Sequence, residues 1–194
     1  NKFNDDIELI KDKSDFWEKM IFDSAIILND YELKNSSILD IGTGAGFPGM
    51  IIALVYKNIS VTLIESNQKK CTFLNEIKEK LGISNVEIIC DRIENYGIKN
   101  REKYDVVTSR AVSNLAILSE ISIPLLKING IFVAMKANLN NEIECSKKIL
   151  LNLNATIIKI DEFKLPIEES IRNLVIIRKD KITNLKYPRN FDKM

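Results

Sequence analysis

The sequence of 194 residues contains no histidine. Histidine is the commonest general base near neutral pH, the base of the Ser–His–Asp triad and a frequent zinc ligand. Its absence excludes triad-type hydrolysis and most zinc chemistry. An enzyme with this sequence must therefore catalyse its reaction without an imidazole.

Cysteine is scarce as well, with three residues far apart, Cys71, Cys90 and Cys145. An odd number at wide spacing fits neither a disulfide framework nor paired metal ligands. We therefore expect reduced, mostly buried thiols and no bound metal. The stretch at 1–17 does not show the basic head and apolar core of an export signal, and no apolar run is long enough to cross a bilayer. We therefore expect a cytoplasmic protein without membrane contact.

Neither sign of charge is in excess, because 28 basic residues face 27 acidic ones. A nucleic-acid binder usually shows a basic excess somewhere, so only a local cluster would support that function. The C-terminus has one, with five cations and two acids between Lys179 and Met194. The length favours a single core. We divide the chain into a helical segment (1–34), a main domain (35–180) and a basic tail (181–194).

Short runs rich in Ile and Val alternate with stretches whose apolar residues recur at helical spacing. Strands are predicted at 36–42, 61–66, 86–90, 104–110, 131–136, 155–165 and 173–179, and helices at 14–30, 48–57, 67–82, 114–127 and 140–153. Ser14 or Asp15 is the expected N-cap of the first helix, and Gly82 and Gly130 are expected at a helix end and a turn. This alternation predicts an α/β fold with a mostly parallel seven-stranded sheet and an antiparallel C-terminal hairpin.

The joint between the first strand and the next helix contains Gly42, Gly44 and Gly46. Glycines there permit positive φ and leave no Cβ between the backbone and a ligand at the carboxyl end of the sheet. Phe47 stands where a dinucleotide motif needs its third glycine, and no Walker lysine follows. The acid just before the loop, Asp40, instead suits a positively charged ligand such as S-adenosylmethionine, which carries sulfonium and ammonium groups.

Two further acidic sites follow the next two strands. Glu65 closes the second strand, where a carboxylate can accept both hydroxyls of a ribose. Asp91, Ile93 and Glu94 follow the third strand, where the edge and face of an adenine could be met. Three acids after three consecutive strands are expected to lie in register and to bind one nucleoside.

These motifs belong to a longer set of matching segments: FDS (22–24), DIGTGAGFPG (40–49), ESNQKKCTFL (65–74), DRIENYG (91–97), YDVVTSRAV (104–112), GIFVAMKA (130–137), LPIEESIRN (165–173) and KYPRN (186–190). With them, the chain from Lys19 to Arg189 resembles the glucose-inhibited division protein B family, bacterial small-subunit rRNA guanine-N7 methyltransferases. The most specific matches are GFPG, SRA and YPR. The sequence departs from the family at Met20, where relatives commonly have a histidine, and family members usually have further helix upstream.

The resemblance implies a Rossmann-like class I methyltransferase domain over 35–180, S-adenosylmethionine as cofactor, and a guanine in the decoding-site loop of 16S rRNA as acceptor. Guanine N7 has a free lone pair at neutral pH, so the lack of histidine is no handicap. We therefore expect positioning residues and no proton shuttle. Arg110, which matches a cofactor-contacting family arginine, and Lys136 are the positioning candidates, and Phe47 is a candidate wall for the base. Lys69, Lys70, Lys136 and Arg189 are the candidate contacts to RNA phosphates.

Two other functions stay open at this point. One is a methyltransferase of the same fold acting on a small molecule or a protein. The other is an RNA-binding module without turnover. The sequence leaves undetermined the methylated nucleotide, the choice between naked rRNA and the assembled small subunit, and the oligomeric state, for which a monomer is expected.

Overall fold

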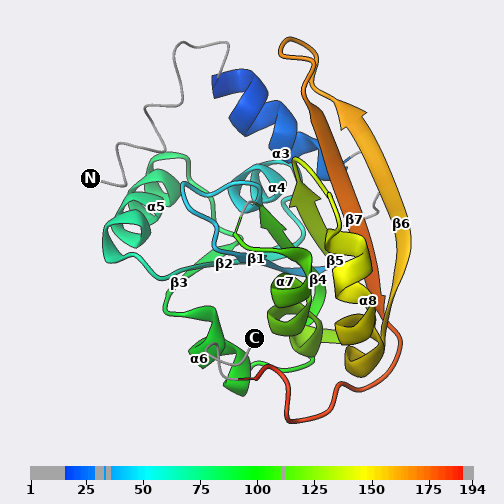
Figure 1. The fold of residues 1–194 in the computed structure, drawn as a ribbon. Helices are drawn as coiled ribbons and strands as arrows, with labels where there is room; N and C mark the ends of the chain where they lie inside the picture. The colour runs from blue at the N-terminus through cyan, green and yellow to red at the C-terminus, as the bar shows by residue number, and fades with distance from the viewer. Residues whose placement is uncertain (1–15, 29–32, 34–35, 111, 190–194) are drawn as a thin grey trace.

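The structure is a computed structural model, and it describes residues 16–28, 33, 36–110 and 112–189. Seven strands form one sheet in the order β3-β2-β1-β4-β5-β7-β6 (Figure 1). Their bounds are β1 Ser37–Ile41, β2 Ser60–Glu65, β3 Val86–Cys90, β4 Tyr104–Arg110, β5 Leu126–Lys136, β6 Ala155–Lys164 and β7 Ile171–Lys179. The first five strands pair in parallel, and β7 is antiparallel to both β5 and β6. The predicted fold class is confirmed.

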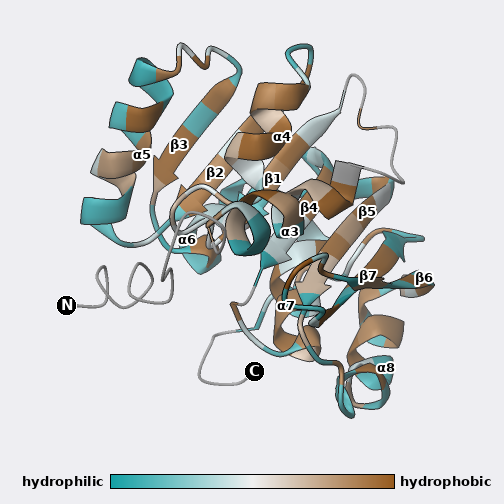
Figure 2. Cartoon of the chain, turned by 90° about the horizontal axis from the view of Figure 1, so that it is seen from above, coloured by the Kyte–Doolittle hydropathy of each residue, from teal (hydrophilic) through white to brown (hydrophobic). Residues whose placement is uncertain are grey.

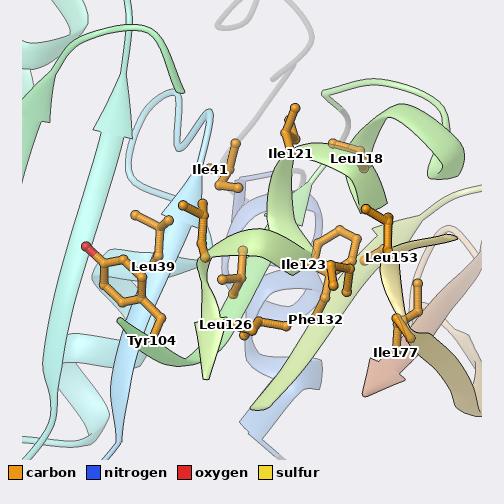
Figure 3. Close-up of a cluster of buried hydrophobic side chains, with 14 of the residues drawn as sticks. Leu39, Ile41, Tyr104, Leu118, Ile121, Ile123, Leu126, Phe132, Leu153 and Ile177 are labelled. Carbon is orange, nitrogen blue, oxygen red and sulfur yellow. The ribbon is translucent and has the colours of Figure 1, made fainter. Parts of the chain in front are cut away.

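Helices cover both faces of the sheet. They are α4 Gly49–Val55, α5 Gln68–Lys80, α6 Ile93–Lys99, α7 Leu115–Ser122, followed by the 3₁₀ turn η3 Ile123–Leu125, and α8 Glu142–Leu153. In β1, Leu39 and Ile41 belong to the core under α7 and α8, whereas Ile38 belongs to the core under α4 (Figure 3). Figure 2 shows largely apolar strands in the middle of the molecule, with polar residues on the outer helices α5 and α8. Because side chains alternate along a strand, Asp40 points to the same side as Ile38, towards α4.

One local prediction was wrong, and one helix was missed. β5 begins at Leu126, which pairs with Tyr104, so Gly130 lies inside a strand and not in a turn. A Cβ at Gly130 would stand 2.9 Å from the carbonyl oxygen of Asp105, which explains the glycine by close backbone approach. Helix α6 was not predicted, because it is mostly polar and contains Gly97.

The predicted N-terminal segment is helical, but its periodicity differs from that of the α-helix expected from the sequence. Its described part consists of the π-helix η1 Trp17–Phe22, α3 Asp23–Ala25 and the 3₁₀ turn η2 Ile26–Leu28. The expected caps, Ser14 and Asp15, lie outside the described residues. Because a π turn has more residues than an α turn, the buried face changes: Trp17 is exposed, and Glu18 is buried.

The Glu18 carboxylate attaches this segment to the β6–β7 connection. Its Oε1 accepts hydrogen bonds from the backbone N–H groups of Ile167 (2.5 Å) and Glu168 (2.9 Å). Lys19 adds an ion pair to Glu168 at 2.7 Å. Figure 1 shows the result, with the N-terminal helical segment lying beside β7.

The described part of the predicted tail, residues 181–189, is docked on the domain. Thr183 and Tyr187 are buried. The Arg101 guanidinium donates to the carbonyl oxygens of Thr183 (2.8 Å) and Tyr187. The domain limits proposed from the sequence, 34/35 and 180/181, stay predictions.

The cysteines correct another expectation. All three are free, but only Cys71 is buried, whereas Cys90 and Cys145 are exposed. Within the described ranges, no helix combines the length and apolar character needed to cross a bilayer. The same ranges contain no group of three potential metal-ligating side chains.

Candidate active site

The turn after β1 uses each glycine differently. Gly42, Gly44 and Gly46 have φ values of +64°, +60° and +99°. A Cβ at Gly46 would stand 2.6 Å from Cγ of Met50, so this glycine serves packing under α4. A Cβ at Gly44 would have nothing nearer than a backbone oxygen at 4.0 Å, so its side towards the cavities is open. Of the three glycines, Gly42 and Gly44 line the two cavities described below, and Gly46 lines neither of them.

The Asp40 carboxylate braces this turn from inside. It is fully buried, and its Oδ2 accepts hydrogen bonds from Thr43 Oγ1 (2.6 Å) and from the Gly49 N–H (2.9 Å). Its Oδ1 is buried without a hydrogen-bond partner among the described residues. Burial raises the pKa of Asp40 to about 6, although both hydrogen bonds and the nearby Arg110 oppose this. Asp40 lines neither of the two cavities described below.

The predicted register of the three acids is therefore wrong at Asp40. Asp40 pairs with Leu63 in β2, two residues before Glu65. Glu65 itself pairs with Cys90, directly before Asp91. Strand β1 thus ends deeper in the sheet, which places Asp40 under the turn while Glu65 and Asp91 reach the cavity above it.

A smaller cavity of about 230 Å³ lies beyond the ends of β1, β2 and β3. Its lining includes Glu65, Asp91, Ile93 and Glu94, which is where the sequence predicted them together. Glu65 Oε2 accepts the Gly44 N–H at 3.1 Å, and Oε1 accepts the Asn67 N–H at 2.9 Å. Each carboxylate oxygen has a second lone pair, so Glu65 can hold the turn and still accept ligand hydroxyls.

A larger cavity of about 660 Å³ continues from the smaller one, with Gly42 and Val112 lining both. It lies between the glycine turn, the N-terminal helical segment and the ends of β4, β5 and β7. Five cations line it, Lys19, Lys70, Arg110, Lys136 and Arg172, together with two carboxylates, Asp23 and Glu142. The larger cavity therefore has a cationic wall.

Arg110, at the end of β4, is held by the N-terminal helical segment. Its Nη1 donates to the Lys19 carbonyl oxygen at 2.9 Å and lies 3.6 Å from Asp23 Oδ2. Its Nη2 contacts Met20 Sδ at 3.5 Å, and its guanidinium lies 5.7 Å from the centroid of the Phe47 ring. Burial lowers the pKa of Arg110, and Asp23 opposes that effect.

Lys136, at the end of β5, is paired within the larger cavity. Its Nζ donates to the Ser113 carbonyl oxygen at 2.7 Å and lies 2.9 Å from Glu142 Oε2. The same Glu142 oxygen accepts the Leu115 N–H at 2.6 Å, at the start of α7. Lys136 thus connects β5, α7 and α8 at one wall of the cavity.

The remaining predicted RNA contacts are divided. Lys70 lines the larger cavity, whereas Lys69 is exposed and lines neither. Arg189 lines neither cavity and forms a bidentate pair with Glu120, with Nε–Oε1 and Nη2–Oε2 distances of 2.9 and 2.6 Å. Glu120 is buried in α7, so Arg189 anchors the C-terminal segment.

Sequence reasoning missed three residues of the larger cavity: Asp23, Glu142 and Arg172. Two of them stand in matching family segments, Asp23 in FDS and Arg172 in LPIEESIRN. Asp23 Oδ2 pairs with both Arg110 and Arg172, at 3.6 and 3.3 Å. Residues 149 positions apart therefore meet at this wall, a contact that no local pattern indicates.

The strand order β3-β2-β1-β4-β5-β7-β6 with an antiparallel β7, the glycine turn after β1 and the carboxylate at the end of β2 are together typical of a Rossmann-like S-adenosylmethionine-dependent methyltransferase. Solved structures share this fold. An S-adenosylmethionine-dependent O-methyltransferase from Thermotoga maritima has a TM-score of 0.66 and 19% identity, covering 92% of this chain and 71% of that one. An rRNA methylase from Streptococcus thermophilus has a TM-score of 0.57 and 20% identity, covering 76% and 89%.

Sequence comparisons identify a family within this fold. The family model of rRNA small subunit methyltransferase G matches residues 1–174. The ribosomal RNA small subunit methyltransferase G of Bacillus subtilis is 42% identical over 195 aligned positions, which cover 97% of this chain and 81% of that protein. The chain belongs to the rRNA small subunit methyltransferase G family.

Proposed function

We propose that this protein transfers a methyl group from S-adenosylmethionine to N7 of a guanine in the decoding-site loop of 16S rRNA. The observation that carries the proposal is the continuity of the two cavities past Gly42 in a chain of this family. The nucleoside half of S-adenosylmethionine suits the acidic smaller cavity, and the acceptor nucleotide of the RNA suits the cationic larger cavity. With ribosomal RNA as substrate, we expect the protein to act in the cytoplasm, and as a monomer.

The residues of the smaller cavity suit the cofactor. When bound, S-adenosylmethionine supplies an electrophilic methyl group on its sulfonium sulfur. Glu65 would accept the ribose hydroxyls, Ile93 would pack on the adenine, and Glu94 would lie at its edge. The open side of Gly44 would let the backbone approach the ligand, and Arg110 would pair with the methionine carboxylate. Asp40 would act indirectly, by holding the turn in shape.

Acceptance at N7 requires no base, and among the described residues that line the larger cavity no carboxylate is free of an ion pair. Its two carboxylates are both engaged, Asp23 with two arginines and Glu142 with Lys136 and the Leu115 N–H. Transfer to an exocyclic amino group would require removal of a proton, whereas the N7 lone pair attacks directly. Placing N7 in line with the methyl group is then the main catalytic task, worth up to about 11 kcal/mol.

Contacts to the acceptor RNA would come from the walls of the larger cavity. Phe47 presents an apolar ring beside Arg110, which suits a splayed-out base. Lys70 and Lys136 would approach the RNA backbone. For Lys69, which is exposed near the same helix end, the RNA contact stays a prediction, and Arg189 would contact RNA only with the part of its guanidinium left outside the Glu120 pair.

The test is methylation of small ribosomal subunits, and separately of naked 16S rRNA, from a strain that lacks this gene. We expect label from S-adenosylmethionine to enter one guanine, and mass spectrometry of digested rRNA reports the base and its position together. Absence of incorporation into both substrates contradicts the proposal. Label in a small molecule or a protein would instead favour a different acceptor for the same fold.

The cofactor half has its own test in Glu65→Gln. Loss of a charged acceptor for ribose hydroxyls should weaken S-adenosylmethionine binding on the order of tenfold in calorimetry. The matched control is Glu79→Gln on the exposed face of α5, which should bind as the wild type does. Equal affinity in all three proteins would exclude Glu65 as a cofactor contact.

A further inference from the structure

Two arginines in the wall of the larger cavity share a single carboxylate. Arg110 Nη1 and Arg172 Nε lie 3.6 and 3.3 Å from the same oxygen, Oδ2 of Asp23. All three side chains are largely buried, with exposed fractions of 18%, 20% and 10% for Arg110, Arg172 and Asp23. One positive charge at this wall is therefore not balanced by the shared carboxylate.

The neighbouring cations do not share this excess, because two of them have carboxylates of their own. Lys136 pairs with Glu142 at 2.9 Å, and Lys19 pairs with Glu168 at 2.7 Å. Asp40 also attracts Arg110, and Glu168 attracts Arg172, both without forming an ion pair. Among the described residues the two guanidiniums share one ion-pair partner, Asp23, and such an arrangement at a cavity wall is suited to an anionic ligand. The two guanidiniums also have donors to spare. Arg110 Nη2 meets only the weak acceptor Met20 Sδ, and Nη2 of Arg172 has no hydrogen-bond partner among the residues described.

The sheet order separates the two arginines by distance from the cofactor turn. Arg110 ends β4, which is adjacent to β1 and its glycine turn. Arg172 begins β7, three strands away from β1 in the order β1-β4-β5-β7. At about 4.8 Å between neighbouring strands, the Arg172 backbone lies roughly 14 Å from β1. The Arg172 backbone therefore lies farther from the cofactor turn than the Arg110 backbone does, although both guanidiniums meet at Asp23.

We propose that Arg172 is a positioning residue that binds a backbone phosphate of the acceptor RNA and so places the target guanine in the larger cavity. This inference rests on the proposed function. A guanidinium offers a planar pair of donors that matches phosphate oxygens, and its Nη2 is available for that contact. Asp23 holds the Arg172 Nε in place before RNA binds, because the N-terminal helical segment is itself fixed through Glu18.

The test compares Arg172→Gln with Arg172→Lys and with Arg178→Gln. Arg178 is the matched control: it lies at the other end of β7 and is also paired with an aspartate, Asp180, at 2.8 Å. For Arg172→Gln we expect KM for small subunits to rise on the order of tenfold, with kcat changed less than about twofold. The affinity for S-adenosylmethionine should stay at the wild-type value, and Arg178→Gln should resemble the wild type in every measurement.

Salt dependence separates a phosphate contact from a packing role. Losing one phosphate contact to single-stranded RNA should reduce the slope of log K for 16S rRNA binding against log salt by about 0.7. Arg172→Lys should restore that slope, because it keeps the charge. A weaker affinity for S-adenosylmethionine with unchanged RNA binding overturns the proposal and assigns Arg172 to the cofactor carboxylate. Equal behaviour of the Gln and Lys variants, with a lowered melting temperature in both, overturns it in favour of a structural role.

A failure of the Arg172 proposal can be distinguished from a failure of the proposed function. If the wild type transfers no methyl group to rRNA, the proposed function fails. The RNA-binding slope still decides the role of Arg172, since it needs no turnover. An unchanged slope in Arg172→Gln overturns the phosphate contact whether or not methylation occurs.

Discussion

Ionisation of Asp40 should make the protein less stable as the pH rises through the weakly acidic range. Burial raises the pKa of Asp40 from its ordinary value of 3.8 to about 6. Between these values the folded state holds a proton that the unfolded state has released, so the free energy of unfolding falls with rising pH. At about 1.4 kcal/mol per tenfold change in the proton affinity, the loss is about 3 kcal/mol, complete above pH 6 or so.

The perturbation that isolates this effect is Asp40→Asn. The asparagine oxygen can accept the same hydrogen bonds from Thr43 and Gly49, and its amide adds a cost that does not depend on pH. The measurement is urea unfolding of the wild type and the variant at pH 4, 5, 6 and 7. The wild type should lose about 2 kcal/mol of stability between pH 4 and pH 7, and the variant should not, because pH 4 already lies above the unfolded-state pKa of 3.8.

The control is Asp91→Asn. Hydrogen bonds from Asn95 and the Arg92 N–H lower the pKa of Asp91, so it is ionised in both states above pH 5. Its difference from the wild type should therefore be constant from pH 5 to pH 7. A constant difference for Asp40→Asn over the full range would refute the reasoning, because it would mean that Asp40 ionises in the folded protein as it does in the unfolded chain.

Two further predictions concern stability. Arg189→Gln leaves the buried Glu120 carboxylate without its bidentate partner. Since the arginine is partly exposed, we expect the free energy of unfolding in urea to fall by about 2 kcal/mol. A variant that also carries Glu120→Gln should recover most of this loss. Full stability of Arg189→Gln would show that water replaces the pair. Gly46→Ala should cost about 3 kcal/mol in thermal unfolding, because its Cβ would meet Met50 at a position where φ is +99°. Gly82→Ala, also at positive φ but in open space, should cost about 1 kcal/mol, and equal losses would rule out the clash with Met50.

Local pattern was sufficient for most of the sheet. Strands β3 and β4 have the predicted bounds, and the β6–β7 hairpin is antiparallel as expected, since hydrophobic runs and short connections are local properties. The failures have local causes too. The N-terminal segment uses a π turn, so an analysis at α-helical spacing placed Trp17 on the buried face. Helix α6 is as short as α4, but it is mostly polar and contains Gly97, whereas α4 is almost entirely apolar, so only α4 could be predicted.

The sequence by itself determined the α/β class, the glycine turn and the placement of Glu65, Asp91, Ile93 and Glu94 around one cavity. These follow from strand ends, because parallel strands bring their carboxyl ends to one edge of the sheet.

Only the tertiary structure decided which charges are available at that edge. It buries Asp40 two residues below Glu65, pairs Arg189 with Glu120, and brings Asp23 from the N-terminal segment between Arg110 and Arg172. Such pairings depend on register and on contacts between residues far apart in the chain, and a sequence pattern contains neither.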